Sequence, residues 1–112
     1  MRLPGADKAI VEREKVVNYL LNATHPDNDG KARFFIGLGF SQEDWQRLAT
    51  ALRNAAGNHS VSKMMASPHG TKYVVDIRIQ TPSGKKPMVR TVWIVDLGAE
   101  TFRLVTAYPS EQ

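Results

Sequence analysis

The spacing of the apolar residues changes once along this chain, near residue 58, and this change constrains the fold more than any other feature. Before it, apolar side chains recur every three or four residues, as in amphipathic helices. After it, apolar and polar side chains alternate, as in strands with one buried face. Helices followed by strands predict an α+β fold, with two or three N-terminal helices packed on a four-stranded antiparallel sheet.

The first half of the chain contains three stretches that favour helix. Apolar residues at helical spacing predict helices over Val11–Asn22 and Lys31–Leu38. Ser41 is expected to cap a third helix of about 15 residues, which ends at Gly57 and Asn58. The first nine residues are expected to form an irregular lead-in.

The second half predicts four strands separated by short turns. Because short turns join antiparallel neighbours, the simplest sheet is a meander in sequence order. A chain of 112 residues also predicts a single domain, residues 1–112. The expected strands are Ser60–Ala66, Lys72–Thr81, Val89–Asp96 and Thr101–Tyr108.

Composition excludes several classes of function. The chain has no cysteine, which rules out disulfides, thiol catalysis and cysteine-based zinc sites, and its three histidines lack the helical spacing of a metal site. We therefore expect neither a metal nor another cofactor. No apolar run is long enough to span a membrane, and the N-terminus has no signal peptide, so an exported form would rely on a longer parent chain or a carrier. A net charge of +4 and a pI near 9.6 favour an anionic partner, such as nucleic acid or an acidic inhibitor protein.

The stretch from His25 to Phe35 carries the densest functional pattern. Within nine residues it combines His25, Lys31 and Arg33 around a turn rich in Pro, Asp, Asn and Gly. An imidazole ordinarily exchanges protons near neutral pH, and two fixed cations beside it can hold a phosphate. The stretch therefore predicts a site that handles a phosphodiester, with His25 as general acid or base. The alternative is that all three side chains are solvated turn residues.

A second set of candidates follows from strand alternation. If Val92 and Ile94 face the helices, the open face of the sheet carries hydroxyls, aromatic rings and guanidinium groups. Such groups can hold phosphate oxygens and stack on bases. The alternative is structural, since a strand tryptophan is more often part of the core. The expected open-face residues are Arg78, Thr91, Trp93, Thr106 and Tyr108, with Arg90 at the edge of that face. His59 and His69 are explained by a helix end and a turn, and are given no function.

Several segments resemble a bacterial domain family that lacks an assigned activity. They are Leu3–Ala9, Tyr19–Asn22 with His25-Pro26, Lys31–Phe35, Arg90–Val95 and Arg103–Pro109. This family is found as small stand-alone proteins and at the C-termini of secreted adhesins and phage head proteins. Domains in that position are commonly toxins.

The order of helices and strands also resembles the barnase, colicin D and RelE group of RNases. This resemblance implies metal-independent cleavage of RNA, with tRNA as one candidate, through the ribose 2′-hydroxyl. It implies catalytic roles for His25, Lys31, Arg33, Thr91, Thr106 and Tyr108, and RNA-binding roles for Arg78, Arg90 and Trp93. It further implies action in a bacterial cytoplasm and an immunity or antitoxin protein as partner. No glutamate of the barnase kind is evident.

The leading hypothesis is therefore an endoribonuclease toxin domain. It requires the His25 imidazole to meet the strand hydroxyls in one groove. A non-catalytic module that binds nucleic acid or a partner protein is the alternative, and a toxin that attacks DNA or a nucleotide is a third.

Overall fold

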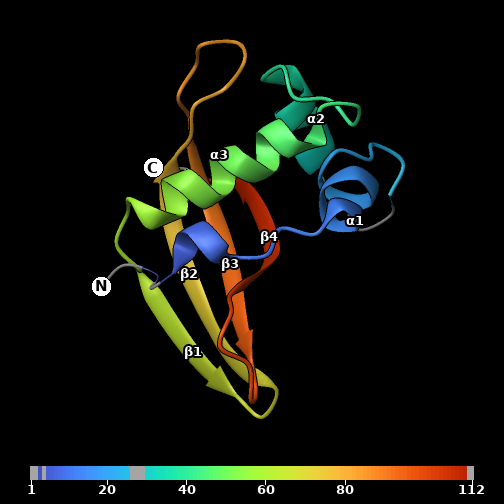
Figure 1. Cartoon of the computed structure of the whole chain (residues 1–112). Helices are drawn as coiled ribbons and strands as arrows, with labels where there is room; N and C mark the ends of the chain where they lie inside the picture. Colours follow the sequence, from blue (N-terminus) through green and yellow to red (C-terminus); the bar gives the residue numbers. More distant parts are fainter. Residues whose placement is uncertain (1–2, 4, 26–29, 111–112) are drawn as a thin grey trace.

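The computed structural model describes residues 3, 5–25 and 30–110, and its sheet is the predicted antiparallel meander. Four strands lie in the order β1-β2-β3-β4, each antiparallel to its neighbour (Figure 1). The α+β class is therefore confirmed. The strands are β1 (Lys63–Ser67), β2 (Gly70–Arg78), β3 (Met88–Asp96) and β4 (Arg103–Pro109).

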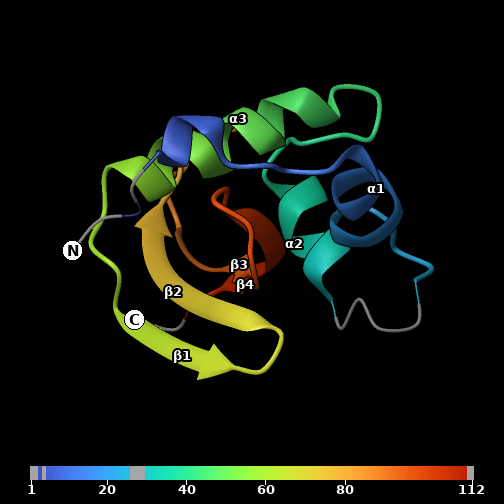
Figure 2. The same ribbon diagram turned by 60° about the horizontal axis from the view of Figure 1, so that its bottom comes forward.

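Helices cover one face of this sheet and also flank one of its edges. The longest, α3 (Trp45–Gly57), crosses the strands, while α1 (Arg13–Lys15) and α2 (Lys31–Gly37) lie on the side of β4 (Figures 1 and 2). A π-helical segment, η2 (Val16–Leu20), continues directly from α1. The edge formed by β1 lies on the opposite side from α2 (Figure 2). No described helix is long and apolar enough to cross a membrane.

The core lies between α3 and the inner face of the sheet. The inner side of α3 presents Leu48 and Leu52, both fully buried, against β2. Because alternate strand residues point the same way, Val75 and Ile77 reach this core while Asp76 between them faces outward. Burial of each such aliphatic side chain contributes about 1.5–3 kcal/mol, so this layer holds the helices to the sheet.

The element boundaries differ from the predictions in ways that have local causes. Ser41 caps a turn instead of the helix itself, since its hydroxyl accepts the Asp44 amide at 3.2 Å and α3 begins one residue later. The lead-in contains a short 3₁₀ helix, η1 (Ala6–Lys8), because Ala6 and Ala9 pack into the core. The first predicted helix is shorter, starting at Arg13.

The predicted orientation of β3 is wrong. Val89, Thr91 and Trp93 face the helices with no exposed surface, whereas Arg90 and Val92 face outward and are only half-buried. The Trp93 indole N–H donates to the Thr91 hydroxyl at 2.8 Å, and that hydroxyl donates to the Val75 carbonyl at 2.7 Å. This chain of hydrogen bonds lets a polar threonine lie in the core without an unsatisfied group.

A β-bulge in β4 sets which of its side chains face outward. Val92 pairs with Thr106 and Trp93 pairs with Leu104, so Val105 has no partner on β3. The extra residue reverses the alternation between Leu104, which is buried, and Thr106. Thr106 and Tyr108 therefore lie on the outer face, where the sequence placed them.

Candidate functional site

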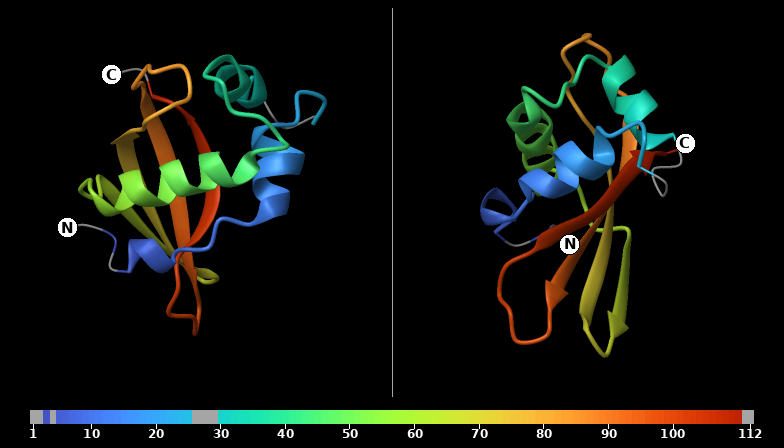
Figure 3. Two further views of the ribbon diagram at one scale, coloured as in Figure 1. Left: turned by 45° about the horizontal axis from the view of Figure 1, so that its top comes forward. Right: turned by 90° about the vertical axis from the view of Figure 1, so that its right-hand side faces the viewer.

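A groove of about 730 Å³ lies where the first helical segment meets β4. In Figure 3 the ribbon of this segment runs beside β4, at the sheet edge away from β1. Its lining mixes cations, carboxylates, an imidazole and hydroxyls from parts of the chain far apart in sequence. The lining residues are Glu12, Glu14, Lys15, Asn18, Tyr19, His25, Arg103, Val105 and Thr106.

Tyr19 joins the two halves of this groove. Its hydroxyl shares a hydrogen bond of 3.4 Å with the Thr106 hydroxyl on β4. Its ring meets the His25 imidazole edge to face, with centroids 5.1 Å apart. The imidazole and the strand hydroxyl thus share one groove, as the sequence hypothesis requires. The sequence analysis missed Tyr19, because a tyrosine at helical spacing next to Leu20 and Leu21 is indistinguishable from a core residue.

Two lysines surround the Tyr19 ring. The ammonium groups of Lys15 and Lys31 each lie 5.3 Å from the ring centroid. Burial alone raises the pKa of the Tyr19 phenol, but the hydrogen bonds from Thr106 and Lys31 and the two lysine charges outweigh it, so the pKa lies below its ordinary value. The two lysine charges among these causes would also attract a phosphate.

Lys31 extends this positive region onto the outer face of the sheet. Gly30, with a φ of 83°, allows the chain to turn directly into α2, so Lys31 stands at the start of that helix. Its ammonium also lies 5.9 Å from the Tyr108 ring centroid. Lys31 thereby connects the groove to Tyr108 on the outer face.

The groove also contains carboxylates that the sequence analysis did not identify. Glu12 directly precedes α1 and Glu14 is the second residue of that helix, and both line the groove with His25. Arg103 stands on the β4 side and is held by Asp96 in two hydrogen bonds of 2.9 and 3.0 Å. The Asp96 contacts, with a smaller contribution from Glu12, raise the pKa of the Arg103 guanidinium. The charge of Arg103 is therefore largely compensated, and the lysines carry most of the positive charge.

The structure separates the remaining predicted residues from this groove. Arg33 is exposed on α2 and does not line the groove, while Thr91 and Trp93 are buried in the core and cannot reach a ligand there. Arg78 is exposed, but it donates to the Lys86 carbonyl at 2.7 Å in the loop after β2. Arg90 is on the outer face and forms a two-bond ion pair with Asp76, at 2.7 and 2.9 Å.

His59 lies just after the end of α3, and both of its ring nitrogens form hydrogen bonds to the backbone. Its Nδ1 lies 2.7 Å from the Ala55 carbonyl at the end of α3. Its Nε2 accepts the Arg78 backbone N–H at 3.4 Å. These two hydrogen bonds tie α3 to β2.

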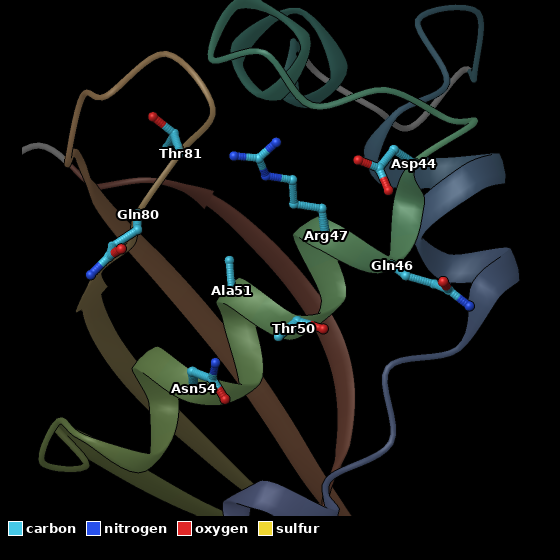
Figure 4. A pocket seen from close by; sticks show the side chains of 8 residues that line it. All are labelled: Asp44, Gln46, Arg47, Thr50, Ala51, Asn54, Gln80 and Thr81. Carbon is cyan, nitrogen blue, oxygen red and sulfur yellow. The ribbon is translucent and has the colours of Figure 1, made fainter.

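A second groove, of about 490 Å³, lies between α3 and the segment that follows β2. Figure 4 shows Arg47 extending from α3 toward Thr81, with Asn54 and Gln80 farther along. This groove has one cation and one carboxylate, Asp44, and no imidazole. It lacks a group that exchanges protons near neutral pH, so it is the weaker candidate for acid–base chemistry. Among the described residues no three histidines or acidic side chains cluster as metal ligands.

A family model for a domain of unknown function, DUF6883, matches residues 2–111. The chain belongs to the DUF6883 family. Its fold is similar to that of a chain in the contact-dependent growth inhibition toxin–immunity protein complex from Klebsiella pneumoniae 342. The two share 19% sequence identity with a TM-score of 0.73, over 91% of this chain and 100% of that chain. None of the curated proteins matches this chain. At this identity the likeness concerns the fold alone, and the barnase-like chemistry stays a prediction.

Proposed function

We propose that this DUF6883 domain is a toxin that cleaves RNA without a metal. The observation that carries the proposal is the convergence of His25, Tyr19 and Thr106 in one groove, with Lys15 and Lys31 around the tyrosine ring. An imidazole, hydroxyl donors and cations are the kinds of group that catalyse phosphodiester transfer.

The proposed reaction uses the substrate's own ribose as nucleophile. The 2′-oxygen attacks the adjacent phosphorus, and a base takes the 2′ proton. The bond from phosphorus to the 5′-oxygen of the next nucleotide breaks, and that oxygen receives a proton. The products are a 2′,3′-cyclic phosphate and a 5′-hydroxyl end. His25 is assigned to one of these proton transfers, and Glu12 or Glu14 is the available partner for the other.

The other side chains act on the phosphate and the neighbouring base. Lys31 and Lys15 neutralise charge that builds on the phosphate oxygens, and the Thr106 hydroxyl donates a hydrogen bond to one of them. Tyr108, next to Lys31, offers a ring for stacking. The proposal gives no direct part to Thr91 and Trp93, whose hydrogen bonds are used inside the core, nor to Arg33 outside the groove.

The toxin part of the proposal draws on the similar Klebsiella chain, which is described as part of a toxin–immunity protein complex. By extension, we propose that this domain acts in a bacterial cytoplasm after delivery from a secreted parent chain, and that an immunity protein neutralises it. A pI near 9.6 suits an acidic inhibitor.

The test is incubation of the purified protein with total cellular RNA in excess EDTA. We expect cleavage that leaves 2′,3′-cyclic phosphate ends, and a loss of rate of at least about 100-fold in His25→Ala and Lys31→Ala. His69→Ala, in the turn between β1 and β2, is the matched control and should keep full activity.

Two results would redirect the proposal. Intact RNA, together with binding that weakens strongly with salt, would support the non-catalytic module instead. Activity that appears only with added metal, or only on DNA, would support a different toxin chemistry.

A further inference from the structure

A separate pocket lies on the outer face of the sheet, opposite the helices, and all four strands contribute to it. Its volume is about 360 Å³. Its lining residues are Ser62, Lys63, Met65, Val74, Arg90, Val92 and Tyr108. Strand register explains why they meet, because Lys63 pairs with Val74, Val74 pairs with Val92, and Arg90 pairs with Tyr108.

The centre of this pocket is apolar although it faces away from the core. The open face of an antiparallel sheet is normally polar, yet Met65, Val74 and Val92 lie side by side here. An apolar patch bordered by polar groups on an open face marks a binding surface. The apolar centre suits the flat face of a ring better than it suits a phosphate.

The rim of the pocket is built from fixed polar groups. Asp76 holds Arg90 through two hydrogen bonds, and Arg90 lines the pocket beside Tyr108, with which it pairs on β4. The Asp76 carboxylate compensates much of the Arg90 charge. Arg90 therefore contributes a guanidinium plane in a fixed orientation, and little net charge, to the rim of the pocket. Lys63 forms no ion pair within the described part of the chain, so it supplies the net positive charge at this rim.

Tyr108 and Lys31 connect this pocket with Tyr19 in the groove around His25. One side of Tyr108 lines the pocket with Arg90, and its ring also lies 5.9 Å from the Lys31 ammonium. Lys31 reaches in the other direction to Tyr19. A strand of nucleic acid whose phosphate lies at Lys31 would therefore place an adjacent base at the pocket.

We propose that this pocket binds one nucleobase of a single-stranded RNA, from a nucleotide next to the phosphate held in the groove. The apolar floor and Tyr108 receive the face of the base, and Lys63 holds the following phosphate. This inference rests on the proposed function for its ligand, but the pocket can be tested without catalysis.

The experiment compares two neighbouring methionines on β1. Met65 lines the pocket, whereas Met64 points to the opposite face of the same strand and is 60% exposed. Met65→Glu and Met64→Glu change the net charge and the edge strand equally. Both are made in a His25→Ala background, and binding of a labelled single-stranded RNA oligonucleotide is measured by fluorescence anisotropy.

We expect Met65→Glu to weaken binding about tenfold, comparable to the loss of one stacked base, and Met64→Glu to weaken it less than twofold. The difference between the two variants should vanish with an oligonucleotide of equal length that carries abasic sites. Equal binding by the two variants, or a difference that persists on the abasic strand, would overturn the subsite.

This binding test and the test of the proposed function can fail independently. Cleavage of RNA by the unaltered protein tests the proposed function, whereas the two methionine variants test the subsite. If the protein cuts RNA and the two variants bind alike, the subsite fails and the proposed function stands. If RNA stays intact and the base-dependent difference is present, the pocket stands as a binding site and the proposed catalysis fails.

Discussion

Thr91 shows how one hydroxyl can be essential to the core without touching a ligand. It is fully buried on β3, accepts the indole N–H of Trp93 and donates to the Val75 carbonyl. A buried N–H that loses its partner costs about 1–3 kcal/mol. The hydroxyl and the tryptophan therefore form a structural pair inside the sheet.

We expect Thr91→Val to lower the free energy of unfolding by about 2 kcal/mol, because the indole N–H keeps its place and loses its acceptor. Urea unfolding followed by tryptophan fluorescence measures the change. Thr91→Ser is the control, since it keeps the hydroxyl and should lose less. A valine variant as stable as the unaltered protein would show that the hydrogen bonds contribute nothing net.

The orientation of β3 could have been predicted from a different residue. Both alternating sets on this strand contain large apolar side chains, so hydrophobicity alone does not decide which set is buried. Arg90 does decide it, because a guanidinium rarely enters a core without a partner and its set must therefore face outward. The sequence analysis weighted Val92 and Ile94 instead, and this inverted the positions of Thr91 and Trp93.

Tyr19 is the residue on which the groove can be tested by titration. Its phenol should titrate below the ordinary value of 10.0, since Thr106, Lys31 and Lys15 stabilise the phenolate more than burial disfavours it. The pKa of Tyr19 is lower in the folded protein than in the unfolded chain. Ionisation of Tyr19 therefore stabilises the fold at alkaline pH, and this stabilisation is lost as the pH falls through the pKa of the folded protein.

We expect Lys31→Ala to raise the pKa of Tyr19. Tyrosinate absorbance against pH gives the value, with the Tyr19→Phe variant subtracted to remove the other two tyrosines. Lys85→Ala, in the loop after β2, serves as the control and should leave the curve unchanged. A Tyr19 that titrates at or above its ordinary value would contradict the positive potential inferred for the groove.

At the scale of elements, the bulge in β4 is the feature that builds the outer face. Without it, Leu104, Thr106 and Tyr108 would share one side of the strand, because side chains alternate with a period of two. With Val105 unpaired, Leu104 enters the core while Thr106 and Tyr108 face outward. From the sequence, strand alternation puts these three side chains on one face, whereas their polarity puts them on different faces. A bulge resolves this conflict, but it leaves no clear residue pattern by which it could be predicted.

Deletion of Val105 should therefore be tolerated. It makes Leu104 and Thr106 consecutive in a regular strand, where alternation keeps them on opposite faces, so we expect the free energy of unfolding to fall by less than about 2 kcal/mol. Deletion of Val75 from β2, which pairs regularly with both neighbours, is the control; it forces Asp76 or Val74 to change faces and should cost at least about 3 kcal/mol. Urea unfolding monitored by circular dichroism compares the two, and equal costs would refute the role of the bulge.

The helical elements show where local sequence stops being informative. Apolar spacing located all the main helices, because their buried stripes are long enough to read. It did not reveal that the first helix widens into the π-helical η2, where the Leu21 amide bonds the Val16 carbonyl at 2.8 Å. That widened turn belongs to the segment that carries Tyr19 to β4.

At the scale of the whole molecule, the proposed path for RNA runs from the groove around Tyr19 to the pocket at Lys63. Lys15, Lys31 and Lys63 lie along this path from different elements. The overall charge of +4 alone would attract any polyanion without regard to position. The position of individual charges is therefore what distinguishes a defined path from general attraction.

Salt dependence of binding separates these two possibilities. Three lysine–phosphate contacts with single-stranded RNA predict a slope of about −2 for the logarithm of the binding constant against that of the salt concentration. In a His25→Ala background, we expect Lys63→Gln to reduce this slope by about 0.7, the share of one phosphate. Lys85→Gln removes the same charge from the loop after β2, away from the path, and should leave the slope unchanged. Fluorescence anisotropy at several salt concentrations gives both slopes, and equal reductions would mean that RNA responds to the net charge and follows no defined path across the sheet.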